Sequence, residues 1–279
     1  MRTVAIAGTG LIGGSFGLAL RKAGFAGQII GVSSPPAIAA ALERGAISSS
    51  GTLEEVAPRA DLLYLAQPVD RILETLDKLG QLTVAPGCLI TDAGSTKSTI
   101  VRQAAASLTS GSFLGGHPLA GKEQRGAAAA DADLFRDRPY VLTPTGPETS
   151  AQAEFRAWLS RLGARIIDLS PEEHDVTVAL TSHLPQLVST ALAATLADQA
   201  DHPLDRVFGP GLVDMTRLAL SPPDLWLSIL ATNRPAVLAA LDSFVTSLTT
   251  IRQTLGTRKL SESFVSAKDF ASRLRNLDT

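Results

Sequence analysis

Residues 4–15 read Val-Ala-Ile-Ala-Gly-Thr-Gly-Leu-Ile-Gly-Gly-Ser, a short apolar run that leads through closely spaced glycines into a helical pattern. In a dinucleotide-binding unit Gly8 makes the tight turn, Gly10 lets the backbone approach a pyrophosphate, and Gly13 lets the helix pack against the strand. The glycine spacing alone is a weak signal, but the strand before it and the helix after it supply the context that it requires. The stretch therefore predicts a nucleotide site.

The composition is that of a globular protein with room for two domains. The chain has 279 residues, of which 45% are hydrophobic and 19% charged, so it can bury a sizeable core. A net charge of -2 offers no basic field, and we expect binding to neither nucleic acid nor an anionic membrane. The single cysteine, Cys88, excludes an internal disulfide, and neither a signal-peptide pattern nor a bilayer-spanning apolar run is seen. These features indicate a cytoplasmic protein.

Up to about Ser170, short apolar runs alternate with amphipathic helical patterns. The predicted strands are Val4–Gly8, Gln28–Ser33, Asp61–Ala66, Cys88–Thr91, Ser112–Gly116, Pro139–Thr143 and Arg165–Leu169. This alternation predicts an α/β domain with a mostly parallel sheet that is covered by helices on both faces.

After Leu169 the pattern becomes helical throughout. Residues 170–173 read Ser-Pro-Glu-Glu, with a serine cap, a proline at the first helical position and a glutamate in place for a capping box. The predicted helices are Pro171–Ala200, Leu204–Leu220, Pro223–Ala231, Pro235–Leu255 and Lys259–Leu277. We therefore expect a dinucleotide-binding domain over residues 1–169 and a helical domain over residues 170–279.

The first of these helices is unusual in its composition. From Val176 through Ala197 it has no Asp, Glu, Lys or Arg, and a helix that is hydrophobic all round is normally buried all round. A small domain cannot cover such a helix alone, so the sequence predicts a homodimer formed by the helical domain. Pro185 predicts a kink, and the nearby His183 and Gln186 need polar partners there. The alternative for His183 is a satisfied core histidine at a structural kink.

Two loops at the carboxyl ends of predicted strands gather polar and small residues, at residues 92–97 and 117–123. Ligands of open α/β sheets bind at this edge. His117 can accept a proton near neutral pH, and a hydroxyl such as that of Ser95 could orient it. The four histidines are too scattered for a zinc site, and His202 is predicted to lie at the surface.

Arg217 and Trp226 flank a proline-containing loop of the helical domain. An arginine within an otherwise apolar helix offers a fork for a carboxylate. A salt bridge to Asp214 or Asp224 explains the arginine equally well, and periodicity does not decide between them.

Four segments together carry a family resemblance. They are residues 8–15, residues 91–97 (Thr-Asp-Ala-Gly-Ser-Thr-Lys), residues 116–121 (Gly-His-Pro-Leu-Ala-Gly) and residues 182–185 (Ser-His-Leu-Pro). In this order the set resembles the prephenate and arogenate dehydrogenases of tyrosine biosynthesis over nearly the whole chain. The resemblance implies a Rossmann-type domain followed by an all-α dimerisation domain, and the oxidative decarboxylation of a cyclohexadiene with hydride transfer to NAD(P)+.

The resemblance also implies roles for individual residues. His117 would be the catalytic histidine bonded to the ring hydroxyl, with Ser95 as its partner, and Arg217 would hold a substrate carboxylate. In or beside the pocket would lie His183, Glu123 and Trp226.

Two positions depart from the common family pattern and bear on specificity. Where many prephenate-using members have a second histidine, this chain has Gln186, whose neutral amide oxygen can accept from the ammonium of arogenate. Where NAD-using members have an acidic residue after the second strand, this chain has Ser33 and Ser34, whose hydroxyls can donate to a 2′-phosphate. We therefore expect arogenate to be accepted alongside prephenate, and NADP to be favoured with NAD possible. The pyrophosphate is expected at the helix N-terminus, at Leu11 and Ile12.

Two other functions remain open from the sequence. One is another two-domain NAD(P)-dependent dehydrogenase of the β-hydroxyacid or imine type, against which the Gly-His-Pro and Ser-His-Leu-Pro segments count. The other is a non-catalytic NAD(P)-binding dimer, which would need only the nucleotide site and not His117, Ser95 and Arg217 together.

Overall fold

The computed structural model describes residues 1–122, 124–199 and 202–277, and the chain divides into two compact units after Arg234. The first unit contains one eight-stranded sheet in the order β3-β2-β1-β4-β5-β6-β7-β8. The strands are β1 (Thr3–Ala7), β2 (Gln28–Val32), β3 (Ser49–Ser50), β4 (Leu62–Leu65), β5 (Leu89–Asp92), β6 (Ser112–Pro118), β7 (Pro139–Thr143) and β8 (Arg165–Asp168). Neighbouring strands are parallel except for β6 and β7, so the predicted mostly parallel sheet is confirmed.

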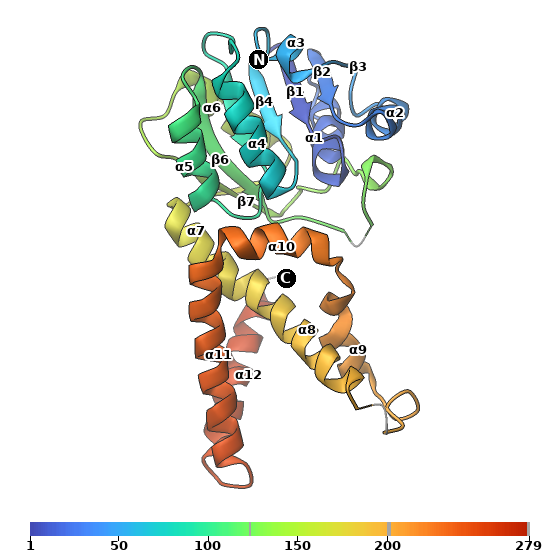
Figure 1. Ribbon diagram of the computed structural model, residues 1–279, viewed down its shortest axis with the longest axis vertical. Coiled ribbons are helices and arrows are strands. Elements are labelled where there is room, and N and C mark those ends of the chain that lie inside the picture. The colour runs from blue at the N-terminus through green and yellow to red at the C-terminus, as the bar shows by residue number, and fades with distance from the viewer. Residues whose placement is uncertain (123, 200–201, 278–279) are drawn as a thin grey trace. The chain divides into compact units, whose positions relative to one another are not determined.

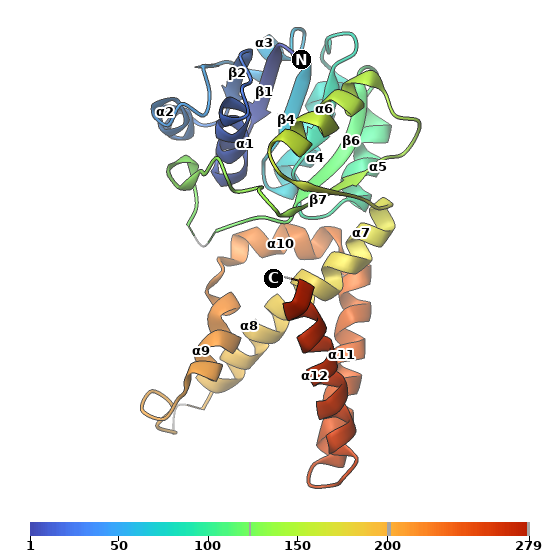
Figure 2. The same ribbon diagram turned by 180° about the vertical axis from the view of Figure 1, so that it is seen from behind.

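Both faces of the sheet are covered, which explains why its strands are apolar at successive positions. Val4 and Ile6 of β1 pack into one buried cluster, whereas Ala5 and Ala7 pack into the other. The helices on the first face include α1 and α6, and those on the second include α4 and α5 (Figures 1 and 2). The bounds are α1 (Leu11–Lys22), α2 (Pro35–Glu43), α3 (Leu53–Val56), α4 (Val69–Gly80), α5 (Ser98–Ser107), the 3-10 turn η1 (Ala127–Ala129) and α6 (Ser150–Arg161).

All seven predicted strands are present, and their ends differ from the prediction by at most two residues. The additional strand, β3, consists only of Ser49 and Ser50, and both residues are exposed. Two exposed serines carry no apolar alternation, so nothing in their sequence indicated a strand.

The predicted helix over residues 171–200 is divided into three segments. These are α7 (Pro171–Val178), the π-helical segment η2 (Ala179–His183) and α8 (Leu184–Ala197). Pro185 lacks the N–H that would bond to the carbonyl of Thr181, and its ring crowds that carbonyl, so the backbone widens just before it. The expected kink therefore takes the form of a π-helical turn that ends at His183.

The predicted helix over residues 204–220 begins later than expected. It consists of α9 (Pro210–Thr216) and the 3-10 turn η3 (Arg217–Leu220). Gly209 is extended, as the residue before a proline usually is, and the helix starts at Pro210.

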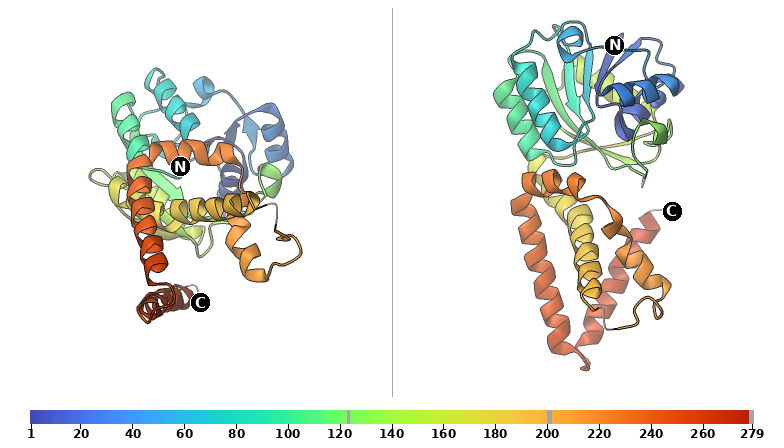
Figure 3. Two further views of the ribbon diagram at one scale, coloured as in Figure 1. Left: turned by 60° about the horizontal axis from the view of Figure 1, so that its bottom comes forward. Right: turned by 45° about the vertical axis from the view of Figure 1, so that its right-hand side comes forward.

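Helix α10 (Pro223–Thr232) lies across the carboxyl edge of the sheet, and it can be followed in orange in Figures 1 and 3. Ile229 is buried in the same cluster as Val69 and Ile72 of α4. The Thr232 hydroxyl lies 2.9 Å from that of Thr96, in the loop after β5. These contacts hold α10 against the loops in which chemistry was predicted.

The second unit begins at Pro235, the second residue of α11 (Arg234–Thr254), and also contains α12 (Leu260–Leu277). The two helices run in opposite directions (Figure 2). Large apolar side chains stay exposed on both, among them Val245, Phe264 and Phe270. Over the described residues, none of the helices combines the length and the apolar character that a membrane crossing requires.

The predicted domain boundary lies where β8 ends and α7 begins. The compact units divide elsewhere, because α7 and α10 are bonded to the loop after β5. The division at residues 169 and 170 stays a prediction.

Candidate active site

The glycine loop has the geometry of a phosphate cradle. Gly8 has a φ of +90°, and a Cβ there would lie 2.4 Å from the carbonyl oxygen of Ala66. A Cβ on Gly13 would lie 2.0 Å from the carbonyl oxygen of Gly8, whereas a Cβ on Gly10 would meet open space. Because Gly10 is the N-cap of α1 and has no side chain to cap it, the first N–H groups of the helix remain for an anion. The loop fits the pyrophosphate of a dinucleotide.

A cavity of about 380 Å³ lies beside this loop at the carboxyl edge of the sheet. Leu11 and Ile12 line it from α1, Ser95 from the loop after β5, and Lys122 and Arg125 from the segment after β6. Residues of α10 close another side of the cavity. Of the predicted nucleotide residues, Leu11 and Ile12 thus line one cavity together with Ser95.

A second cavity, of about 330 Å³, lies at the end of β2. Ser33 lines it together with Lys78 of α4 and Glu54 of α3. Ser34 is exposed and forms the N-cap of α2. The position after β2 therefore presents hydroxyl groups, and a lysine that sequence reasoning missed lines the same cavity.

His117 stands near the carboxyl end of β6 and is half-buried. Its Nδ1 lies 2.8 Å from Nε2 of His174 on α7, and Nδ1 of His174 lies 2.8 Å from Oδ1 of Asp175. Burial lowers the pKa of His117 well below its ordinary value, and His174, Lys97 and His183 lower it further by charge repulsion. At neutral pH His117 is an uncharged ring that can accept a proton.

His174 and Asp175 were not singled out from the sequence. The only signal was a His-Asp pair in the second turn of a helix that a capping box begins, and such pairs commonly occupy helix surfaces. Here both are buried, because α7 packs its first turns against the loop after β5.

A buried ion pair lies close to His117. Lys97 and Asp92 are both fully buried, and Nζ of Lys97 donates to Asp92 and, at 2.8 Å, to the carbonyl oxygen of Gly116. Burial lowers the pKa of Lys97, although the carboxylates of Asp92 and Asp175 oppose this shift. The pair joins the ends of β5 and β6, and it brings the ammonium group of Lys97 near His117.

His183 lies at the end of the π-helical segment and is buried. Its Nδ1 lies 3.3 Å from Nδ2 of Asn233, which also donates to the carbonyl oxygen of Asp175 at 2.8 Å. The ring meets Trp226 edge to face, with centroids 6.0 Å apart. Burial lowers the pKa of His183 to about 4, although the nearby Asp175 opposes this shift. The structure thus brings His183 and Trp226 together and joins His183 to Asp175.

Gln186 is buried one turn further along α8. Its Nε2 donates to the carbonyl oxygen of Leu218 at 2.8 Å, while its Oε1, among the described residues, has no hydrogen-bond partner. Arg217, which precedes Leu218, is exposed and opens η3. The hydrogen bond from Gln186 to Leu218 thus links α8 to η3, the turn that begins at Arg217.

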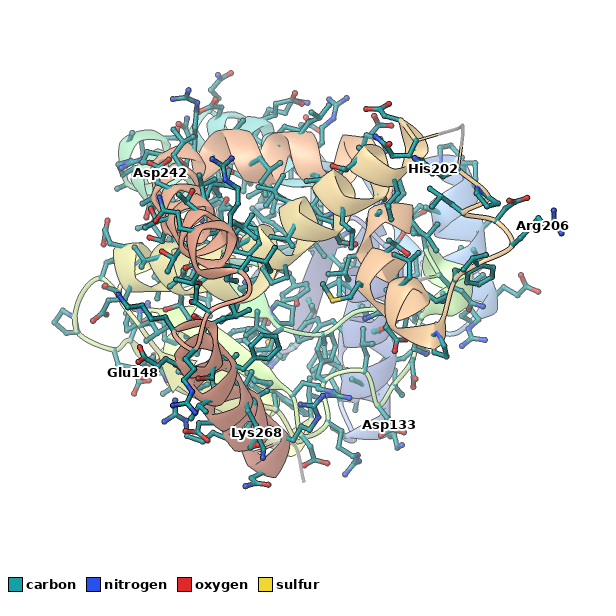
Figure 4. The ribbon with its side chains drawn as sticks, turned by 90° about the horizontal axis from the view of Figure 1, so that it is seen from below. Asp133, Glu148, His202, Arg206, Asp242 and Lys268 are labelled. Atoms are coloured by element: carbon teal, nitrogen blue, oxygen red, sulfur yellow. The ribbon has the colours of Figure 1, made fainter. Side chains whose placement is uncertain are left out.

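The other predicted residues lie at the surface, in the cavity or outside the described residues. Glu123 lies outside the described residues. His202 is exposed, as predicted, and Figure 4 shows it on the connection between α8 and α9. His117 is hydrogen-bonded to His174, and no hydrogen bond to Ser95 is seen among the described residues, so the role of Ser95 stays a prediction. Within the described chain, no three His, Cys, Asp or Glu side chains gather as a metal site would need.

Comparisons with known proteins agree with this geometry. The family model for the prephenate dehydrogenase nucleotide-binding domain matches residues 16–168, and the model for the prephenate dehydrogenase dimerization domain matches residues 170–267. The prephenate dehydrogenase of Bacillus subtilis is 36% identical over 98% of this chain and 76% of its own length.

Solved structures show the same likeness. Prephenate dehydrogenase from Aquifex aeolicus, in complex with hydroxyphenyl propionate and NAD+, matches with a TM-score of 0.91 and 30% identity over 98% of each chain. Synechocystis arogenate dehydrogenase matches with a TM-score of 0.82 and 30% identity over 98% of this chain and 99% of its own. The resemblance and the fold class predicted from the sequence are confirmed, and the chain belongs to the prephenate dehydrogenase family.

Proposed function

We propose that the protein catalyses the oxidative decarboxylation of prephenate or arogenate with hydride transfer to NAD(P)+. The observation that carries this proposal is the position of His117. In a chain of this family, an uncharged histidine stands at the carboxyl edge of the sheet, the edge at which Ser95 lines one cavity with Leu11 and Ile12. A site for a nucleotide alone would need no proton acceptor there.

The dinucleotide would be held by the glycine loop, through Gly8, Gly10 and Gly13, with its pyrophosphate at the N–H groups of Leu11 and Ile12. Its nicotinamide supplies the hydride acceptor when it is bound. The chain itself orients the substrate and handles the proton.

His117 would accept the proton of the ring hydroxyl as the carbon that bears the hydroxyl loses its hydride, with Ser95 as the partner of His117. The electron-poor ring then loses carbon dioxide and becomes aromatic. Because aromatisation drives the reaction, the task of the protein is mainly to position and polarise the substrate.

The substrate carboxylate would be bound by Arg217, whose guanidinium suits a bidentate contact. The remaining predicted pocket residues are His183, Gln186, Glu123 and Trp226. The buried Oε1 of Gln186 supports the acceptance of arogenate alongside prephenate, since an amide oxygen can accept from an ammonium group.

NADP is the favoured cofactor of this proposal, and NAD is possible. Ser33 replaces an acidic residue that would repel a 2′-phosphate, and Lys78 adds a positive charge to the same cavity. Glu54 lines that cavity as well and opposes the lysine, so the preference for NADP is expected to be modest.

In this proposal residues 1–169 form the dinucleotide-binding domain, and residues 170–279 form a helical domain that makes a homodimer. The proposed location is the cytoplasm, where a single, buried and unpaired cysteine such as Cys88 is common. The absence of nucleic-acid binding stays a prediction from the net charge.

The test is the appearance of reduced cofactor on mixing the purified protein with each pairing of NAD or NADP with prephenate or arogenate. We expect absorbance of the reduced nicotinamide with at least one substrate, and a higher specificity constant with NADP. No reduction with any of the pairs, in a protein that still binds the nucleotide, would favour a non-catalytic dimer.

A further inference from the structure

The carboxylate of Asp175 is fixed at three points. Its Oδ1 accepts from the backbone N–H of Lys97 at 2.7 Å, and its Oδ2 accepts from the backbone N–H of Ser98 at 2.9 Å. Nδ1 of His174 lies 2.8 Å from the same Oδ1. Burial alone would raise the pKa of Asp175, but these hydrogen bonds lower it below its ordinary value. An ionised carboxylate only accepts hydrogen bonds, so the proton between Asp175 and His174 belongs to His174.

His174 is completely buried, and this sets the state of its second nitrogen. Burial lowers the pKa of His174, although the bond to Asp175 opposes the shift, so the ring is neutral at pH 7. A neutral imidazole carries one proton. With that proton on Nδ1, Nε2 of His174 is left with a lone pair, and it lies 2.8 Å from Nδ1 of His117.

We infer that Asp175 and His174 are positioning residues that fix the tautomer of His117. Nε2 of His174 accepts a hydrogen bond from Nδ1–H of His117, so the neutral ring of His117 keeps the lone pair on Nε2. Nε2 of His117 is then the atom that takes the substrate proton. We call these three residues the relay.

The opposite arrangement is disfavoured by the same contacts. If His117 carried its proton on Nε2, its Nδ1 could only accept, and His174 would have to donate from Nε2. Nδ1 of His174 would then face Oδ1 of Asp175 as two acceptors at 2.8 Å, and a buried charged group would lose a hydrogen bond. The fixed carboxylate therefore selects one tautomer at both histidines.

The relay also suits the reaction, and this step rests on the proposed function. As the hydride leaves the ring carbon, the O–H electron pair forms the carbonyl bond and the proton moves to Nε2 of His117. The resulting imidazolium keeps its Nδ1–H bonded to His174, in a chain that ends at the ionised Asp175. The charges that face the relay are Lys97 and Asp92 from the ends of α5 and β5, and His183 from η2 is the other titratable group nearby.

The first test needs no substrate, so it can fail independently of the proposed function. The chain has only four histidines, and the nitrogen resonances of ¹⁵N-histidine-labelled protein report which ring nitrogen carries the proton. At pH 7 we expect His117 and His174 both to be protonated on Nδ1 and bare on Nε2. Protonation of His117 on Nε2 would overturn the inference.

Variants extend the test to activity. In Asp175→Asn the amide can donate to His174, and we expect His117 to lose its single tautomer. His174→Phe should lower kcat roughly 10²-fold, with KM changed little, and His174→Gln should restore part of the loss because its amide oxygen can accept from Nδ1–H. The matched control is His202→Gln, at an exposed position. It should leave the kinetics and the nitrogen resonances of the other three histidines unchanged.

The inference would be overturned if His174→Phe folds, binds nucleotide normally and has a kcat within about threefold of the unsubstituted protein. A loss that small would mean that the general base works without His174. If His174→Phe does not fold, the tautomers measured in the unsubstituted protein decide whether the inference holds.

Discussion

His117 and Arg217 serve the substrate in different ways, and kinetics separates them. A proton acceptor acts on charge that develops only in the transition state, whereas a group bound to a carboxylate contacts the ground state and the transition state alike. The first therefore affects kcat and the second KM. His117 belongs to the hydrogen-bonded relay, while Arg217 lies on the exposed surface of η3.

His117→Asn should lower kcat by roughly two to four orders of magnitude, because the amide cannot take up a proton. Nucleotide affinity, measured by fluorescence titration, should stay within about threefold, since the glycine loop is untouched. Steady-state kinetics with the better substrate checks this. A variant with near-normal turnover would remove His117 from the chemistry.

Arg217→Ala should mostly raise KM, with a smaller effect on kcat, because the guanidinium fork binds the carboxylate in both states. Arg217→Lys keeps the charge but not the bidentate geometry, and its KM should lie between those of the unsubstituted protein and Arg217→Ala. The measurement is substrate saturation at a fixed, saturating cofactor concentration. Unchanged KM in both variants would return Arg217 to a structural ion pair.

Gln186→His tests the choice of substrate. The buried amide oxygen of Gln186 can accept from the ammonium of arogenate, whereas a protonated histidine would repel it. The ratio of specificity constants should therefore move toward prephenate, as measured for both compounds in both proteins. If the ratio is unchanged, Gln186 does not select the substrate.

At the scale of elements, the segment from α7 through η2 to α8 holds two buried neutral histidines, His174 and His183. Asp175 of this segment connects the two histidines. Its carboxylate bonds to His174, and its carbonyl oxygen accepts from Asn233, which in turn contacts His183. Packing that favours neutral rings makes this segment sensitive to acid.

The acid sensitivity can be predicted for His183. Its pKa is about 4 in the folded protein and 6.5 as the ordinary value, so between these values the unfolded chain binds more protons. The stability is fully present above pH 6.5 and is lost as the pH falls toward 4. Going from pH 7 to pH 5 should cost about 2 kcal/mol from His183 alone.

Urea unfolding at the two pH values measures this loss in the unsubstituted protein and in His183→Gln. The difference between pH 7 and pH 5 should shrink in His183→Gln and remain unchanged in the exposed control His202→Gln. An equal pH dependence in all three proteins would show that His183 is not held neutral.

At the scale of the whole molecule, the helices after residue 170 leave large apolar side chains uncovered in a single chain. Leu180 is 51% exposed and Leu227 is 67% exposed, and of α8 only Gln186 and Ser189 are buried. Exposed apolar surface on this scale is typical of an interface. The family model that matches this region describes a dimerization domain.

Light scattering at micromolar concentration should therefore give twice the chain mass of 29.1 kDa. The double variant Val176→Glu with Leu180→Glu places charges on the exposed side of the uncharged helix and should shift the mass toward the monomer. Leu42→Glu, on an exposed site of α2, is the matched control and should leave the mass unchanged. A monomeric unsubstituted protein would contradict the prediction.

The sequence by itself determined the features that depend on neighbours along the chain. The glycine loop could be predicted because turn, approach and packing impose glycine at fixed offsets within one strand and one helix. The start of α7 could be predicted because a capping box joins residues only three apart, and both bonds between Ser170 and Glu173 are present. The apolar strands and the motif segments likewise sufficed for the fold class and the family.

Only the tertiary structure decided which residue His117 contacts. His174 is 57 positions away, and its bond to His117 exists because α7 packs against the loop after β5. The link between Asn233 and Asp175 spans 58 positions and depends on where α10 ends. Periodicity shows which face of a helix is apolar, but it carries no information about which buried polar groups satisfy one another across elements. The sequence therefore led to Ser95 as the partner of His117, whereas the packing of α7 supplied a histidine and a carboxylate.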